Sequence, residues 1–259
     1  VRSRRQRQMC IRDRPSDVVD LDPYGSAAEW ADGAVQAVDD GGLLAVTCTD
    51  LAVLCGRTPE VCFAKYGGIA LAGKKSNHEG ALRLVLQCLQ MAAARHKRDV
   101  EPLLSVQMDF YLRVFVRVRT SAKRSKQAGV RSGPVWQCTT CPAFHLQPSV
   151  RQIGKSDKFA PARGPTAPKK CSECGGAFAM VGPMYTGPLH DQSFVSEVLG
   201  LLDGAGADGG NYKSYKRLGG LLRQVAEELP ECLHYTLPEF SRVVKSQTVP
   251  KASFFSALK

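Results

Sequence analysis

Two carboxylates, a proline and an aromatic ring follow one another in the segment SDVVDLDPYGS, residues 16–26. Its apolar beginning predicts a short buried strand, and the polar residues stand at the end of that strand. Isolated buried carboxylates are costly, so core packing alone does not require Asp20 and Asp22 there. Open α/β sheets bind ligands at the carboxyl ends of their strands. Asp22, Pro23 and Tyr24 are therefore candidate catalytic residues, and Asp20 is a candidate cofactor-binding residue.

These side chains have properties that chemistry on an amino group could use. Pro23 fixes the backbone and has no N–H, so the carbonyl groups around it are free to face a substrate. Asp22 can accept hydrogen bonds from an amino group. Tyr24 offers a face on which a flipped base can stack, an interaction of ~1–3 kcal/mol. Asp-Pro is also a common turn, and the segment alone leaves that interpretation open.

Two Cys-x2-Cys pairs, Cys138 with Cys141 and Cys171 with Cys174, are separated by 29 residues. Each pair can place two thiolates on one metal ion from a tight turn, which the Gly-Gly sequence after the second pair helps to close. Four sulfur ligands are typical of structural zinc and leave no open coordination position. The spacing therefore predicts a structural zinc site. Disulfides or unliganded thiols are the alternatives.

The remaining cysteines indicate a reducing environment. Several stand singly in apolar segments, such as Cys48 in LLAVTCTD and Cys88 in LRLVLQCLQM. Free buried cysteines behave as small apolar residues, and this usage does not suit a secreted disulfide scaffold. The sequence has no secretory signal and no apolar run near the ~20 residues of a membrane span. We expect a soluble intracellular protein without a membrane partner.

Positive charge is concentrated in residues 113–170, which hold thirteen Lys or Arg and one acid, Asp157. This basic block accounts for the net charge of +11 of the chain. Such a block indicates a polyanionic partner, most often nucleic acid, and a solvated surface is the alternative. The candidate RNA-binding residues are Lys123, Arg124, Lys126, Lys169 and Lys170.

Strand and helix patterns alternate up to residue 118. Strands are expected at residues 17–21 and 41–48, with helix formers between them, and a helix begins at Asn77 and carries an apolar stripe. Two further strands, 102–108 and 110–118, are adjacent in sequence, and in the second Phe110 and the alternate residues to Val118 face one way. The pattern predicts a doubly wound α/β sheet that ends in an antiparallel hairpin.

Composition divides the chain into four parts. Residues 1–14 contain six Arg, and RQRQMCIRDR resembles translated sequencing-adapter sequence, so we exclude this stretch as non-native, the alternative being a disordered basic arm. Residues 15–118 form the α/β part, 119–134 a basic linker, and 135–259 a second domain. That domain contains the cysteine pairs and two amphipathic helices, near 192–202 and 212–229.

Three further polar positions have a structural and a functional interpretation. Thr49 and Asp50 follow the second strand and could line the same cleft, although N-capping of a helix by Asp50 is favoured. A capped helix start explains His78 and Glu79 better than a general base does. Four cysteines already complete a zinc site, so His145 is not expected to be a ligand.

Several motifs together resemble the tRNA guanine-26 N2-dimethyltransferases. These are VVDLDPYGSAAEW, GGLLAVTCTDLAVLCG, KSNHEGALRLVL, YLRVFVRV, CPAFHLQP, GPMYTGPLHD and LHYTLPEF. The sequence C-x2-C-x2-FHLQ is closer to eukaryotic members than to archaeal ones. The resemblance runs from about Asp17 to the end of the chain.

The resemblance implies an S-adenosylmethionine-dependent enzyme acting on tRNA. It implies the later half of a class I, Rossmann-like methyltransferase sheet, followed by a truncated α+β domain that holds zinc on four cysteines and binds tRNA. The carboxylate of Asp22 would accept a hydrogen bond from the guanine amino group, Pro23 would shape the pocket, and Tyr24 would stack on the base. The product would be mono- and then dimethylguanosine. The nucleus is favoured over the cytoplasm and the mitochondrion.

The family's Gly-rich cofactor loop, which precedes the D-P-Y segment, has no counterpart in these 259 residues. We therefore expect that this polypeptide by itself neither binds S-adenosylmethionine nor methylates tRNA. Two alternatives stay open. One is a non-catalytic zinc-ribbon RNA-binding fragment, and the other is an amino-methyltransferase that acts on DNA or protein. Oligomeric state is not predicted.

Overall fold

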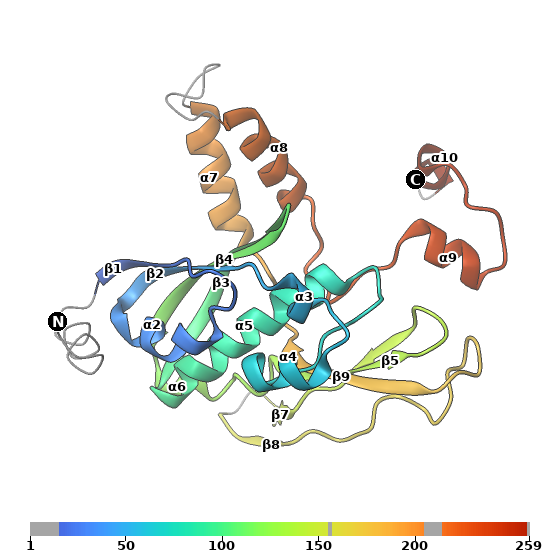
Figure 1. Ribbon diagram of the computed structural model, residues 1–259, viewed down its shortest axis with the longest axis horizontal. Coiled ribbons are helices and arrows are strands. Elements are labelled where there is room, and N and C mark those ends of the chain that lie inside the picture. The colour runs from blue at the N-terminus through green and yellow to red at the C-terminus, as the bar shows by residue number, and fades with distance from the viewer. Residues whose placement is uncertain (1–15, 155–156, 205–213, 258–259) are drawn as a thin grey trace. The chain divides into compact units, whose positions relative to one another are not determined.

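A computed structural model of the chain describes residues 16–154, 157–204 and 214–257 (Figure 1). The arm expected at residues 1–14 lies outside these ranges, as does the helix start expected at Tyr212. Within the described ranges, no helix has the length and apolar character needed to cross a membrane.

Packing divides the chain into two compact units, each assembled from three stretches. The first unit combines residues 1–51, 85–128 and 187–232, and the second combines residues 52–84, 129–186 and 233–259. These units do not coincide with the continuous parts expected from composition. Composition shows where the charge and the residue types of the chain change, but it does not show which separated segments pack together.

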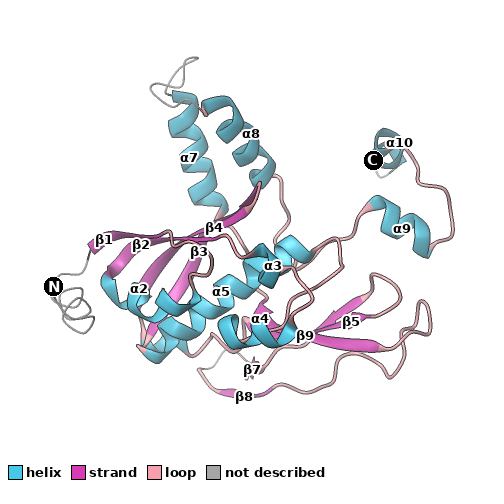
Figure 2. Cartoon of the chain, in the orientation of Figure 1, coloured by secondary structure: helices cyan, strands magenta, loops and turns pink. Residues whose placement is uncertain are grey.

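The first unit contains a mixed four-stranded sheet in the order β1-β2-β4-β3 (Figure 2). Its strands are β1 (Ser16–Leu21), β2 (Val38–Cys48), β3 (Arg98–Met108) and β4 (Tyr111–Thr120). β1 is parallel to β2, whereas β4 is antiparallel to both β2 and β3. The expected α/β character and the final antiparallel hairpin are confirmed, whereas the doubly wound arrangement stays a prediction.

β1 lies at an edge of this sheet, so the expectation of a buried strand is wrong. Its residues are exposed or half-buried, and Val18 is 59% exposed. Within the described ranges β1 pairs only with β2, where Leu21 is opposite Val46. An apolar sequence is compatible with burial, but burial also requires that other elements cover the strand, and an edge strand has a neighbouring strand along only one of its edges.

The inner faces of β4 and α5 (Asn77–Arg95) supply much of the core. In β4, Leu112, Val114, Val116 and Val118 are at most 1% exposed, as the alternation predicts. Phe110, expected on the same face, is 85% exposed because it lies in the turn that precedes β4. In α5 the predicted apolar stripe is buried.

Two pairs of helical elements complete the first unit. The 3-10 helix η1 (Ala28–Trp30) and α2 (Ala31–Ala37) connect β1 to β2. Helices α7 (Gln192–Gly204) and α8 (Tyr215–Ala226) form the expected amphipathic pair, and their buried Val195 and Leu222 cluster with Leu104 and Val106 of β3. The short α6 (Ala122–Ser125) lies within the stretch expected as a linker.

The second unit is built on a three-stranded antiparallel sheet in the order β6-β5-β9. Its strands are β5 (Ser132–Cys138), β6 (Phe144–Leu146) and β9 (Phe178–Tyr185). A second hairpin pairs β7 (Val150–Gln152) with β8 (Phe159–Pro161). The helices are α3 (Leu51–Leu54), which begins at the boundary between the units, α4 (Pro59–Tyr66), the start of α5, α9 (Leu237–Val243) and α10 (Lys251–Ala257).

Candidate functional site

The D-P-Y segment forms a loop at the carboxyl end of β1, and the end of β2 holds it in place. The backbone N–H of Gly25 donates to the Thr49 hydroxyl oxygen at 2.8 Å, and the Thr49 N–H donates to the Gly25 carbonyl at 2.9 Å. Gly25 has a φ of +88°, which a residue with a side chain rarely adopts. Thr49 therefore fixes the loop rather than lining a cleft.

Asp22 and Tyr24 point into solvent at this loop. Tyr24 is fully exposed, and Asp22 is exposed as well. Within the described ranges, neither side chain forms a hydrogen bond or an ion pair with another residue. Both groups are thus available to a substrate, but the described residues do not close a pocket around them.

Asp20 does not share this freedom. Its carboxylate accepts a hydrogen bond at 2.9 Å from the guanidinium of Arg113 in β4, and Arg113 also donates to the hydroxyl of Thr47. The same guanidinium lies 5.2 Å from the ring centroid of Phe115. The carboxylates of Asp20 and Asp22 are both exposed, but of the two only that of Asp20 is paired with a cation within the described ranges. Arg113 was not singled out from the sequence, because a charged residue on an alternating strand usually faces solvent.

The four cysteines of the two Cys-x2-Cys pairs converge at one point. Their sulfur atoms all lie within 4.8 Å of one another. The Sγ–Sγ distance is 3.5 Å from Cys138 to Cys174 and 3.6 Å from Cys141 to Cys171. A tetrahedron with Zn–S bonds of about 2.3 Å has edges of about 3.8 Å, so the four sulfurs fit a single ion of this size.

Glycine is required beside the cysteines. A Cβ atom on Gly176 would lie 2.6 Å from the Thr140 hydroxyl oxygen and 3.2 Å from the Cys138 sulfur. Gly175 has a φ of +73°, and its N–H donates to the Cys171 carbonyl at 2.8 Å. The Gly-Gly sequence thus closes the second pair, as expected from the sequence.

Backbone donors also prepare one thiol for metal binding. Burial alone would raise the pKa of the Cys138 thiol, but the N–H groups of Cys141 and Thr140 lower that pKa to about 7. Burial and the neighbouring sulfur atoms raise the pKa of Cys141 to about 12. Metals bind the thiolate form, and the N–H donors of Cys141 and Thr140 favour that form at Cys138.

Residues near the cluster support it without being ligands. The ammonium group of Lys74 donates to the carbonyl oxygens of Cys138 at 2.7 Å and Cys141 at 3.3 Å. The ring of His145 packs edge-on against Phe178, with a centroid distance of 5.2 Å. No sequence pattern pointed to Lys74, which is 64 residues from Cys138.

Glu79 is part of a buried network in the second unit. Its carboxylate accepts hydrogen bonds from Arg83 at 2.8 Å, from the Leu233 N–H at 2.6 Å and from His234 at 2.9 Å. Arg83 is 1% exposed and also donates to the Tyr185 carbonyl at 3.2 Å. Glu79 therefore has a structural role, and it connects the start of α5 to the segment that leads into α9.

The basic block contains both paired and exposed cations. Arg124 is ion-paired with Asp99, which is fully buried, and with Glu101. The other four candidate RNA-binding residues, Lys123, Lys126, Lys169 and Lys170, are exposed. Contact of all five residues with RNA stays a prediction.

Comparison with known proteins gives one consistent result. Residues 4–259 match a family model described as N2,N2-dimethylguanosine tRNA methyltransferase. The chain is 44% identical to tRNA (guanine(26)-N(2))-dimethyltransferase 1 of Arabidopsis thaliana, over 93% of this chain and 41% of that protein. It is also 44% identical to the tRNA (guanine(26)-N(2))-dimethyltransferase of Homo sapiens, over 93% of this chain and 37% of that protein.

A solved structure is similar to nearly the whole chain. It is the complex of Trm1 from Pyrococcus horikoshii with S-adenosyl-L-methionine, which superimposes with a TM-score of 0.77 at 26% sequence identity. The match covers 97% of this chain and 60% of that one. The chain spans about two-fifths of the length of the curated relatives it matches.

Proposed function

The chain belongs to the N2,N2-dimethylguanosine tRNA methyltransferase family, and we propose that it carries the base-receiving part of such an enzyme. The reaction is methylation of the exocyclic N2 amine of guanine 26 in tRNA, first to the monomethyl and then to the dimethyl product. The observation that carries this proposal is the exposed Asp22-Pro23-Tyr24 loop at the carboxyl end of β1, in a chain 44% identical to relatives named for this reaction.

The solvent-exposed state of Asp22 supports a direct role in the reaction. The N2 lone pair of guanine is delocalised into the ring, so this amine is a poor nucleophile. A carboxylate that accepts a hydrogen bond from the amine localises the lone pair and takes up the proton as the N–CH3 bond forms. Asp20 serves this purpose less well, because its carboxylate already accepts a hydrogen bond from Arg113.

Tyr24 and Pro23 complete the base-receiving loop. A base inside the tRNA stack is out of reach of an enzyme, so it has to be extruded onto a receiving surface. The fully exposed ring of Tyr24 offers such a surface. Pro23 removes one backbone N–H from the loop, and the hydrogen bonds between Gly25 and Thr49 hold the loop still. A rigid loop keeps the acceptor aligned for reaction.

Two further components belong to the proposal. The methyl group would come from S-adenosylmethionine, to which we assign only Asp20 among the described residues. Cys138, Cys141, Cys171 and Cys174 would hold one structural zinc ion, and the Sγ–Sγ distances of 3.5 and 3.6 Å fit it. The parallel β1–β2 pair followed by an antiparallel hairpin is compatible with the later half of a Rossmann-like sheet.

A second candidate function is RNA binding without catalysis. It is favoured by the exposed Lys123, Lys126, Lys169 and Lys170, together with a cysteine cluster whose zinc binding does not depend on S-adenosylmethionine. For the compartment we propose the nucleus, with the mitochondrion as the alternative, because the Saccharomyces cerevisiae relative, 42% identical, is named as mitochondrial.

A chimera tests the proposed function. Residues 17–259 replace the matching segment of the Arabidopsis relative, and methylation is measured on a tRNA transcript with guanine 26 and on one with adenine 26. We expect dimethylguanosine in the first transcript only. The 259-residue polypeptide is assayed alongside for tRNA binding. An inactive chimera that binds tRNA normally would instead favour the non-catalytic alternative.

A further inference from the structure

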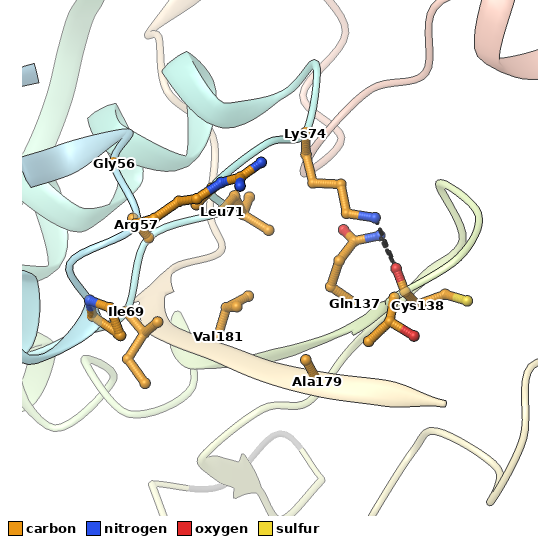
Figure 3. Close-up of a pocket in the computed structure, with 13 residues that line it drawn as sticks. Gly56, Arg57, Ile69, Leu71, Lys74, Gln137, Cys138, Ala179 and Val181 are labelled. Atoms are coloured by element: carbon orange, nitrogen blue, oxygen red, sulfur yellow. Dashed lines mark hydrogen bonds between the residues drawn. The ribbon is translucent and has the colours of Figure 1, made fainter. Parts of the chain in front are cut away.

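A cavity of about 370 Å³ lies within the second unit, away from the D-P-Y loop in sequence (Figure 3). Three parts of the chain form it: the segment that leads into α4, the segment 69–74 before α5, and the paired strands β5 and β9. Its lining residues all belong to the second unit, so its shape depends on that unit alone. Its volume is in the range of small-molecule sites.

The interior of this cavity is apolar. Ile69, Leu71 and Val181 line it, and Leu71 is only 1% exposed. Small side chains, including Ala72 and Ala179, leave space between them. Apolar walls suit the flat faces of a nucleobase, and the lining also contains the polar residues Gln137 and Thr139, which a base with polar edges would need as hydrogen-bond partners.

The mouth of the cavity is positively charged. Figure 3 shows Arg57 and Lys74 on the side facing Ala179 and Val181. Arg57 is exposed, and within the described ranges it forms no hydrogen bond or ion pair. Lys74 donates to carbonyl oxygens, which do not neutralise its charge. No Asp or Glu is among the lining residues, but Cys138 is, and Lys74 lies beside its sulfur cluster, so Arg57 is the cation of this lining that remains available to an anion.

We propose that this cavity receives one unstacked nucleotide of tRNA, in addition to the guanine taken up at the D-P-Y loop. The base would lie against Ile69 and Val181, which line the cavity and are partly exposed, and Arg57 would bind the adjoining phosphate. A guanidinium presents several N–H donors to phosphate oxygens and suits this contact. The inference rests on the proposed function, which identifies the polyanion as tRNA. The evidence that a nucleotide is bound is the cavity itself.

Two variants of the 259-residue chain separate the base contact from the phosphate contact. Arg57→Gln removes the cation at the mouth, and Ala179→Phe fills the cavity from an exposed position of β9 without changing any charge. Lys75→Gln is the matched control, because Lys75 is an exposed cation that does not line the cavity. Affinity for a tRNA transcript is measured by fluorescence anisotropy at several salt concentrations, and zinc content confirms that each variant is folded.

The expected result is a loss of about tenfold in tRNA affinity for both cavity variants. Arg57→Gln also lowers the salt slope by about one, whereas Ala179→Phe leaves the slope unchanged. Lys75→Gln is expected to leave the affinity close to that of the parent. Full affinity of Ala179→Phe would overturn the proposal, and so would equal losses for Arg57→Gln and Lys75→Gln. If the chimera is inactive but the affinities of the variants are as expected, the proposed methylation activity is wrong and the proposed nucleotide site still stands.

Discussion

The ammonium nitrogen of Lys74 lies 2.7 Å from the carbonyl oxygen of Cys138, the first cysteine of a turn that carries two of the four cluster sulfurs. It also reaches the carbonyl of Cys141, the other cysteine of the same pair. One cation therefore clamps both ends of the Cys-x2-Cys turn to the segment before α5. Its positive charge also lies beside the sulfurs, where four metal-bound thiolates would leave a net negative charge.

We expect Lys74→Met to weaken zinc retention, because the turn loses its clamp and the thiolates lose a neighbouring cation. Partners of this kind typically contribute about tenfold or more to metal affinity. The measurement is the rate of zinc transfer to a chromogenic chelator, with Lys75→Met as the control. Equal transfer rates for the two variants would show that Lys74 contributes nothing to the metal site.

Removal of a sulfur ligand should have a larger effect. Purified protein is expected to contain about one zinc ion per chain, and Cys138→Ser or Cys171→Ser should lose it and unfold the second unit, because metal binding supplies folding free energy. Metal content is measured by atomic emission and folding by proteolysis. Cys88→Ser is the control, since this half-buried cysteine lies outside the cluster. Well-folded parent protein without zinc would contradict the prediction.

The periodic elements of the fold were predictable from the sequence, whereas the environment of β1 was not. The alternation in β4 and the apolar stripe of α5 follow from local geometry, since side chains on one face recur at fixed intervals. Burial of β1 depends on which strands lie beside it, and Val18 is 59% exposed despite its apolar surroundings in sequence. The division into two units also escaped prediction, because it depends on packing between distant segments.

Short-range chemistry in the candidate site was predictable, and long-range pairing was not. The spacing within each Cys-x2-Cys pair identified the two halves of the cluster, and the chemistry of zinc, rather than sequence proximity, predicted that they meet. The pairing of Asp20 with Arg113 joins residues 93 positions apart. The basic block likewise looked uniformly available, but Arg124 is held by Asp99 and Glu101, two acids outside the block. A count of charges along the chain cannot show such neutralisation.

Glu79 makes stability depend on pH on the acid side. Burial alone would raise its pKa, but the hydrogen bond from His234 and the charge of Arg83 hold the pKa below its usual 4.5. A lowered folded-state pKa gives stability that is present above pH 4.5 and lost as the pH falls through the folded value. At pH 7, Glu79→Gln should lower the free energy of unfolding by about 3 kcal/mol, because the buried Arg83 loses its charged partner.

Urea unfolding at neutral pH and at two or more acidic pH values measures this effect. The difference between the parent and Glu79→Gln should shrink toward the lowest pH, where Glu79 of the parent is itself becoming protonated. Glu60→Gln is the control, because Glu60 is exposed on α4. A difference that stays constant over this pH range would show that the ionised carboxylate is not what stabilises the network.

RNA binding should depend on the exposed lysines of the basic block. Reversal of charge at Lys123, Lys126, Lys169 and Lys170 is expected to weaken tRNA binding strongly, and to lower the salt slope by roughly one for each phosphate that is no longer neutralised. Arg124 is left unchanged, because its replacement would leave the buried Asp99 without this cation. Reversal at Lys75 and Lys216, two exposed lysines outside the block, is the control. Unchanged binding by the fourfold variant would mean that these lysines are only a solvated surface.

The last prediction concerns Asp22, which the chain leaves exposed and without a partner among the described residues. If its carboxylate accepts the proton of the guanine amine, then Asp22→Ala in the chimera should lower kcat by about 10²–10⁴. tRNA affinity should be unchanged, because Asp22 contributes no positive charge to the polyanion contact. Asp22→Asn keeps an acceptor oxygen but cannot take up the proton, so its kcat should fall between those of the parent and Asp22→Ala. Single-turnover methylation and anisotropy, measured on the same preparations, separate the chemical step from binding. Full activity of Asp22→Ala would refute the assigned role, and parallel losses of rate and affinity would reassign Asp22 to holding the loop.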